Sequence, residues 1–134
     1  MSPPSIRKFA LGDRVYVRAQ QVWLILVAHV MSTSGHWRRR LLTYGELAVR
    51  MGHDPRAGIG LGRELGVIGR YCIDNDLPAL NCIVVGQETG APGPGVLSRH
   101  GDWRQDASDA VRENWFEYRV PTTGTFRQVW EAGV

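Results

Sequence analysis

Lysine is nearly absent from this chain of 134 residues: Lys8 is the only one, and arginine supplies the rest of the 16 basic side chains. An arginine bias of this kind can reflect genomic base composition, so the arginine count alone is weak support for a nucleic-acid partner. With 13 acidic side chains the formal net charge is +3, which permits such a partner without requiring it. Cysteine is also scarce. Cys72 and Cys82 both lie in apolar segments, which excludes a disulfide framework and predicts two free thiols in a reducing cytoplasm.

Long apolar runs are missing as well, and so are the common catalytic and metal-binding motifs. The apolar segment from Val22 to Met31 is too short to cross a bilayer, which takes about 20 residues, and is typical of a buried helix. The N-terminus lacks the charged and apolar regions of a signal peptide. No P-loop, Ser-His-Asp elbow or paired-acid pattern occurs, and the four histidines are not spaced as metal ligands. We therefore expect a cytoplasmic protein with no membrane partner, no metal and no cofactor.

The composition is that of a folded domain. A hydrophobic content of 43% and a charged content of 22% are globular values, and 134 residues suffice for one core. Residues 1–12 are predicted to form a flexible arm, and residues 13–134 a single domain. From Asp13 or Gly12 to about Met31, apolar residues recur at helical spacing, which predicts the central helix. His29 lies within that helix and is expected to pack there rather than to bind a ligand.

The segment from Leu42 to Ala48 carries clear signs of a helix start. Thr43 is expected to be the N-cap, and Glu46 lies where its side chain can reach back to the N–H of Thr43, which completes a capping box. Leu42 and Leu47 are spaced as a hydrophobic staple. Gly52 suits the end of this short helix, and Asp54 followed by proline suits the start of a second one.

The second helix is predicted to be amphipathic. Its apolar stripe consists of Leu61, Leu65, Ile68 and Cys72, and its opposite side carries Arg56, Arg63 and Arg70, which are seven residues apart. Two helices joined by a tight turn, with arginines facing outward, are typical of a DNA-reading helix-turn-helix. Three further arginines, Arg38, Arg39 and Arg40, precede this unit and are candidates for phosphate contacts. An ordinary solvated surface is the alternative for both groups.

The rest of the chain predicts a wing and a helical extension. Residues 80–85 are expected to form a buried strand, followed by a Gly- and Pro-rich loop over 86–95 and a short return strand at 96–97. A helix is expected from Asp106 or Ser108 to about Tyr118, and the type of the element at 126–130 is left open. The predicted fold is α+β, a mainly helical winged helix-turn-helix with a small β-hairpin wing and a C-terminal helical extension.

The order of these segments resembles a known family. Val22-Trp23, Thr43 to Ala48, Ile59 to Arg63, Leu80 to Val85 and Gly86 to Gly95 correspond to consecutive blocks of one domain. That domain is the C-terminal domain of alkylguanine-DNA alkyltransferases and of the alkyltransferase-like proteins, and the resemblance covers a little over half of the chain. It implies a winged-helix DNA binder, with Tyr44 at the target phosphate, where its family counterpart helps to rotate the nucleotide.

The active-site motif of that family is missing. Asn81 falls where the family has its nucleophilic cysteine, Cys82 falls on the activating histidine, and Ile83 replaces an arginine. Ile59 falls on the arginine that fills the gap left by a flipped base, and an apolar side chain can also wedge between bases. Because no base or positive charge is visible beside Cys82, this residue is expected to be a core cysteine. The resemblance therefore implies DNA binding without alkyl transfer.

We expect a non-enzymatic protein that binds duplex DNA. The candidate DNA-contacting residues are Tyr44, Arg38, Arg39, Arg40, Arg56, Ile59, Arg63 and Arg70, and the wing glycines are Gly86, Gly90, Gly93 and Gly95. One alternative is a protein-interaction module, an inhibitor or subunit of a nucleoprotein complex, with Trp37, Trp103 and Trp130 as exposed anchors. A second alternative is a thiol enzyme that acts through Cys82.

Overall fold

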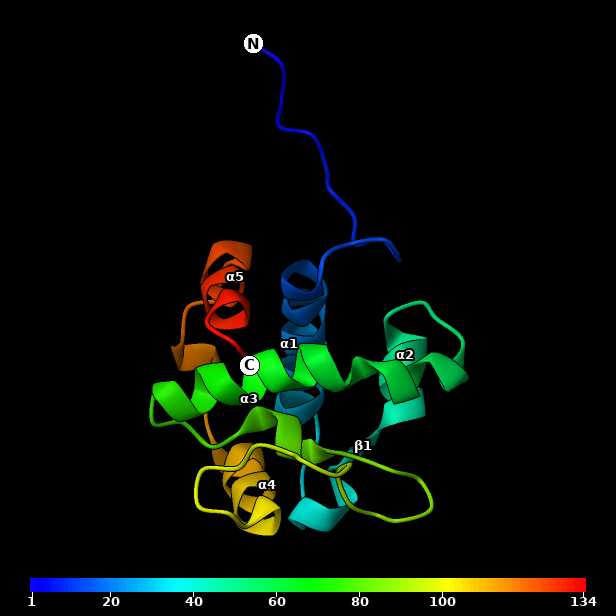
Figure 1. The fold of residues 1–134 in the computed structure, drawn as a ribbon, viewed down its shortest axis with the longest axis vertical. Helices are drawn as coiled ribbons and strands as arrows, with labels where there is room; N and C mark the ends of the chain where they lie inside the picture. The colour runs from blue at the N-terminus through cyan, green and yellow to red at the C-terminus, as the bar shows by residue number, and fades with distance from the viewer.

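The computed structural model describes all residues from 1 to 134 and is α+β, with helices predominating (Figure 1). The α-helices are α1 (Val15–Ser32), α2 (Tyr44–Arg50), α3 (Gly62–Asp74), α4 (Trp103–Arg112) and α5 (Thr123–Glu131). The short 3-10 helices are η1 (Trp37–Arg39), η2 (Pro55–Leu61), η3 (Leu80–Ile83) and η4 (Trp115–Glu117). The only strands are β1 (Leu42–Thr43) and β2 (Val84–Val85), which pair in parallel. Residues 1–10 contain no regular element, are exposed and extend away from the body (Figure 1).

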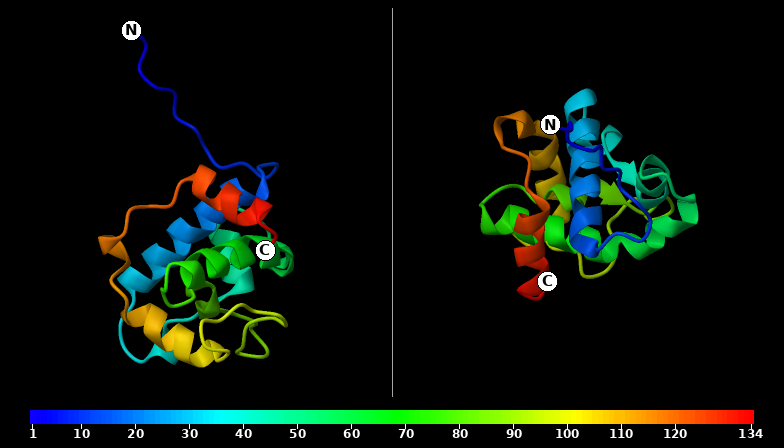
Figure 2. Two further views of the ribbon diagram at one scale, coloured as in Figure 1. Left: turned by 60° about the vertical axis from the view of Figure 1, so that its left-hand side comes forward. Right: turned by 90° about the horizontal axis from the view of Figure 1, so that it is seen from above.

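Helix α1 is the axis of the core, as its apolar spacing predicts. The indole of Trp23 meets Tyr71 of α3 and Trp115 of η4 edge to face at 5.5 Å, and Phe126 of α5 at 6.1 Å. Helices α3 and α5 therefore pack against α1 and also against each other (Figure 2). The helix begins at Val15, because the Asp13 carboxylate accepts the N–H of Ala10 at 2.7 Å and holds a turn there. No helix of the protein is both long and apolar enough to span a membrane.

The capping box that starts α2 is confirmed. The Thr43 hydroxyl accepts the N–H of Glu46 at 3.1 Å, and the N–H of Thr43 donates to the Glu46 carboxylate at 3.3 Å. Gly52 follows the helix with a φ of +89°, a conformation that favours glycine. The Asp54 carboxylate then accepts the N–H of Arg56 at 2.9 Å and starts the next helical segment. We call residues 44–74 the α2–α3 unit.

The prediction of one continuous second helix is wrong. Residues 55–61 form the 3-10 helix η2, and α3 begins only at Gly62. The cause is the close approach of η2 to α2: a Cβ atom on Gly58 would lie 2.4 Å from the carbonyl oxygen of Tyr44. Because a 3-10 helix turns every three residues, Arg56 does not continue the row of Arg63 and Arg70. The apolar stripe of Leu61, Leu65, Ile68 and Cys72 is fully or almost fully buried, as predicted.

The predicted β-hairpin wing is also wrong. β2 pairs in parallel with β1, in the register Leu42 with Val84 and Thr43 with Val85, and residues 80–83 form η3 instead of extending the strand. Val96 and Leu97 belong to no strand. Two features keep the segment after β2 from pairing back on it: its prolines lack an N–H, and Gly90 and Gly95 have positive φ angles of 65° and 77°. An irregular loop over 86–102 therefore replaces the hairpin.

The C-terminal region contains two α-helices where one was predicted. α4 begins at Trp103, with the Asp102 carboxylate accepting the N–H of Arg104 at 3.0 Å, and ends at Arg112. The chain then turns, because the side chain of Asn114 caps η4 by accepting the N–H of Phe116 at 3.3 Å. The element at 126–130 belongs to α5, which packs against α1 and α3.

Candidate nucleic-acid interface

A pocket of about 390 Å³ lies between the α2–α3 unit and the loop after β2. Its lining residues come from five parts of the chain: Tyr44 of α2, Ile59 of η2, Gly62, Leu65 and Gly66 of α3, Asn81 of η3, and residues 93–97 of the loop. Tyr44 and Ile59, both candidates from the sequence, therefore share one cavity with Asn81. The sequence alone did not predict this cavity.

Tyr44 joins α2 to the loop. Its hydroxyl accepts the N–H of Gly93 at 2.7 Å, and Gly93 is one of the four wing glycines. The phenolic oxygen can still donate its own hydrogen to another acceptor, because a hydroxyl both donates and accepts. Ile59 lies on the rim of the pocket and is 91% exposed, which makes it the most exposed large apolar residue outside the N-terminal arm.

Asn81 lines the pocket from η3 and is only 3% exposed. Its Nδ2 donates to the carbonyl oxygen of Leu97 at 3.1 Å, while its buried Oδ1 has no hydrogen-bond partner. The amide lies against Gly69 of α3, where a Cβ atom would come within 2.7 to 3.0 Å of its Oδ1, Cγ and Nδ2. The absence of a side chain at position 69 thus makes room for the amide.

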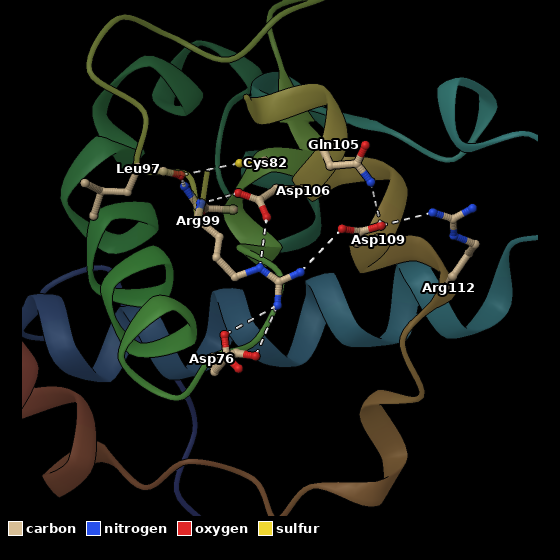
Figure 3. Close-up of polar contacts among 9 residues, drawn as sticks. Asp76, Cys82, Leu97, Arg99, Gln105, Asp106, Asp109 and Arg112 are labelled. Carbon is tan, nitrogen blue, oxygen red and sulfur yellow. Dashed lines mark hydrogen bonds and ion pairs between the residues drawn. The ribbon is translucent and has the colours of Figure 1, made fainter. Parts of the chain in front are cut away.

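A network of charged side chains holds the far end of the loop (Figure 3). The guanidinium of Arg99 lies 3.8 Å from the carboxylate of Asp106, 3.4 Å from that of Asp109 and 3.9 Å from that of Asp76. The backbone N–H of Arg99 also donates to Asp106, which is fully buried. No sequence pattern predicted this network, although the spacing of Asp106 and Asp109 places both on one face of a helix. The network ties the loop to α4 and to the turn after α3.

The structure disfavours Cys82 as a nucleophile. The residue is fully buried, does not line the pocket, and directs its Sγ to the carbonyl oxygen of Leu97 at 3.4 Å (Figure 3). Burial raises the pKa of the Cys82 thiol far above its ordinary value, so the reactive thiolate does not form near neutral pH. Burial likewise raises the pKa of Cys72 to about 12. Both cysteines are free and lie in the core, as predicted.

The arginines predicted for the second helix have different partners. Arg63 is exposed on α3 and has no carboxylate within 4.0 Å, so its guanidinium is free. Arg70 lies 3.7 Å from Asp74. Arg56 pairs with both oxygens of Asp54, at 3.0 and 3.2 Å, and this contact lowers the pKa of that carboxyl.

Arg38, Arg39 and Arg40 are not beside the pocket. They follow the C-terminal end of α1, where η1 packs against α4, on the opposite side of the molecule from the loop over 86–95 (Figure 2). Arg40 turns inward and donates to the carbonyl oxygen of Val30 at 2.8 Å and to the hydroxyl of Thr33 at 3.1 Å. Arg38 and Arg39 remain exposed. The predicted contacts therefore do not form one continuous surface.

The three tryptophans predicted to be exposed are half-buried. Trp37, Trp103 and Trp130 all pack against the core. From α1 onward, the most exposed large apolar side chains are instead Ile59, Phe116 of η4 and Val120, of which the last two are 70% and 61% exposed. The exposure of Phe116 was not predicted, because its neighbour Trp115 is buried and the spacing of apolar residues does not distinguish the two.

His29 is a packed residue, as predicted. Its Nε2 lies 3.0 Å from the carbonyl oxygen of Arg40, and its Nδ1 lies 3.0 Å from the guanidinium of Arg50. Burial and the nearby Arg50 charge lower the pKa of His29 below 6.5. No group of three or more His, Cys, Asp or Glu side chains is placed where it could hold a metal ion.

The fold and site define a mainly helical α+β domain whose pocket is framed by two consecutive helical segments and an irregular loop. No family model, no curated protein and no solved structure matches this chain.

Proposed function

We propose that this protein binds duplex DNA without catalysing a reaction, in the manner of the alkyltransferase-like proteins but with an irregular loop in place of a β-hairpin wing. The observation that carries the proposal is the position of Ile59, an almost fully exposed apolar side chain on the rim of the pocket. Proteins that bend DNA or extrude a nucleotide often insert an apolar side chain between base pairs. The exposure of Ile59 and the cavity beside it, which can receive a displaced base, support this role.

The pocket suits an extrahelical nucleobase. Its volume of about 390 Å³ lies within the range of small-molecule sites. Leu65, Val96 and Leu97 supply apolar walls for the faces of a flat ring, and the Asn81 amide supplies a polar group for its edge. The Tyr44 hydroxyl on the α2 side has a hydrogen to donate to a phosphate oxygen.

The family resemblance supports the same arrangement. Three residues fall on separate functional positions of the family. The counterpart of Tyr44 contacts the target phosphate, that of Ile59 fills the gap that the flipped base leaves in the DNA duplex, and that of Asn81 attacks the alkylated base. All three line one pocket here, although 37 residues separate Tyr44 from Asn81 in the chain. An amide cannot replace a thiolate as nucleophile, so these residues favour recognition of a base without alkyl transfer.

The surrounding surface adds contacts to the DNA backbone. Arg63 is the free guanidinium nearest in sequence to the pocket-lining residues of α3, and we assign it a contact in the groove or to a phosphate. The loop over 86–95 serves as an irregular wing. Arg56 and Arg70 must exchange their carboxylate partners for phosphates, so we expect them to contribute less than Arg63.

Base extrusion and binding are tested together with short duplexes that carry a fluorescent base analogue such as 2-aminopurine. Wild-type protein is expected to bind with an affinity that falls with salt and to raise the emission of the analogue as it leaves the stack. Ile59→Ser is expected to lose the emission increase and to bind about tenfold more weakly, a change of about 1.4 kcal/mol. Arg63→Ala is expected to weaken binding and flatten the salt dependence.

Two matched variants control for general effects on the fold and on net charge. Val120→Ser changes another exposed apolar residue, and Arg119→Ala removes another exposed arginine that has no ion pair; both are expected to bind DNA as wild type does. Unchanged emission and affinity in Ile59→Ser would contradict the proposal. Absence of any binding at low salt would favour the protein-interaction alternative, for which the exposed Phe116 and Val120 are the natural anchors.

A further inference from the structure

A second basic surface lies around two tryptophans, away from the pocket. It consists of Trp37, Arg38 and Arg39 of η1 together with Trp103 and Arg104 of α4. We call it the tryptophan–arginine surface. It draws on two segments that are more than 60 residues apart in the chain but pack against each other.

The side chains of this surface hold one another in place. The Trp37 and Trp103 rings meet edge to face, with their centroids 6.0 Å apart. The guanidinium of Arg38 lies 4.7 Å from the centre of the Trp37 ring, and that of Arg104 lies 5.0 Å from the centre of the Trp103 ring. A guanidinium stacked on an indole keeps its N–H edge free and loses little conformational freedom when it binds an anion.

The arginines of this surface have no acidic partners. Arg38, Arg39 and Arg104 are exposed, and none has a carboxylate within 4.0 Å. Six other arginines are paired with carboxylates, namely Arg18, Arg56, Arg70, Arg99, Arg112 and Arg127. The two acids nearest to Arg104 in the chain are already engaged: Asp102 accepts the backbone N–H of Arg104 at 3.0 Å, and Asp106 faces Arg99. Three uncompensated charges therefore gather at one place.

We propose that the tryptophan–arginine surface binds the phosphate backbone of a second nucleic-acid segment, so that one molecule holds two duplexes. The ring faces are occupied by guanidinium groups and by the neighbouring indole, which leaves little apolar surface for an inserted side chain of a protein partner. What the surface presents outward is positive charge, which complements a polyanion with closely spaced phosphates. The inference rests on the proposed function, because the pocket holds the first duplex.

The test uses the full chain and two short duplexes, one labelled with a fluorescence donor and the other with an acceptor. Four proteins are compared: wild type, a pocket variant (Ile59→Ser with Arg63→Ala), a surface variant (Arg38→Ala with Arg104→Ala) and a charge control (Arg14→Ala with Arg119→Ala). The surface variant and the charge control each lose two exposed, unpaired arginines. Circular dichroism verifies that all four are folded.

Wild type and the charge control are expected to bring donor and acceptor together. The surface variant is expected to bind one duplex with nearly wild-type affinity and to give no energy transfer. The pocket variant is expected to keep only weak binding through the tryptophan–arginine surface. Combining the surface substitutions with the pocket substitutions should abolish that weak binding. In the pocket variant, the logarithm of the binding constant should fall with the logarithm of the salt concentration, with a slope of about 0.9 for each phosphate that the surface contacts.

Each failure has its own pattern. Energy transfer that persists in the surface variant, or is absent in wild type that binds DNA, would overturn the second site and leave the proposed function intact. Wild-type affinity in the pocket variant would overturn the proposed function, and loss of binding in the surface variant would then still support the second site. Polyglutamate and unlabelled duplex are also compared as competitors for the pocket variant, at equal concentrations of negative charge. If polyglutamate displaces the labelled DNA more effectively, an acidic protein is the better occupant and the nucleic-acid assignment is wrong.

Discussion

At the scale of single residues, the contrast between two neighbours determines what the pocket can do. Asn81 lines the pocket, whereas Cys82 points away from it, and both donate to the same carbonyl oxygen, that of Leu97. The 3-10 geometry of η3 separates the two side chains, which a strand would also have placed on opposite faces. A buried amide beside the cavity can offer hydrogen bonds but no nucleophile. This contrast supports the proposal that the pocket recognises a base without reacting with it.

His29 predicts how stability depends on pH. Burial and the neighbouring Arg50 guanidinium, which donates to Nδ1, both disfavour the protonated imidazole and lower the pKa of His29 below 6.5 in the folded protein. Between that lowered value and pH 6.5 the unfolded chain binds more protons than the folded one. The free energy of unfolding should therefore fall as the pH drops through this range, as measured by urea unfolding at several pH values.

Two variants separate the contribution of His29 from that of other groups. His29→Gln should remove this part of the pH dependence, at some cost in stability at neutral pH. Arg50→Gln keeps the imidazole but removes the charge beside Nδ1, so it should weaken this part of the pH dependence. Equal pH profiles for wild type and His29→Gln would show that His29 is not the titrating group.

At the scale of elements, local features were predictable and contacts between distant segments were not. The capping box of α2 depends on residues three apart in the chain, and the apolar stripe of α3 follows from helical spacing alone. η2 could not be predicted, because its geometry is set by the approach of Gly58 to Tyr44. The pairing of β1 with β2 also joins segments about 40 residues apart, so the apolar run before Gly86 suggested a hairpin instead.

The close approach of η2 to α2 can be tested by substitution. A Cβ atom at position 58 would lie 2.4 Å from a backbone oxygen that cannot move without shifting α2, so Gly58→Ala is expected to lower the free energy of unfolding by about 1–3 kcal/mol. Gly60→Ala, in the same 3-10 helix, meets no atom within 4 Å and is expected to be neutral or slightly stabilising. Urea unfolding measures both, and equal stability of the two variants would contradict this packing.

At the scale of the whole molecule, the pocket is assembled from parts that only the tertiary structure brings together. Tyr44, Ile59 and Asn81 were singled out from a family resemblance, but their convergence and the volume between them depend on the position of the loop after β2. That position depends on the Tyr44–Gly93 hydrogen bond at one end and the Arg99 network at the other. Neither contact follows from any local pattern in the sequence.

The Arg99 network should therefore govern both stability and the pocket. Asp106→Asn leaves the largely buried guanidinium of Arg99 without its buried counter-charge, and removing one partner of such a pair costs about 3–5 kcal/mol. We expect a smaller loss, of about 2–3 kcal/mol, because Asp109 and Asp76 remain near the guanidinium. Arg112→Ala removes an exposed partner of Asp109 and should cost less than about 1 kcal/mol. Urea unfolding measures these differences.

The same two variants distinguish a general loss of stability from a specific effect on the pocket. If the network positions the loop, Asp106→Asn should weaken DNA binding under conditions in which it is still fully folded, because residues 93–97 form one wall of the cavity. Arg112→Ala should bind as wild type does. An Asp106→Asn protein that is destabilised yet binds DNA with unchanged affinity would show that the Tyr44–Gly93 contact alone suffices to hold the loop over the pocket.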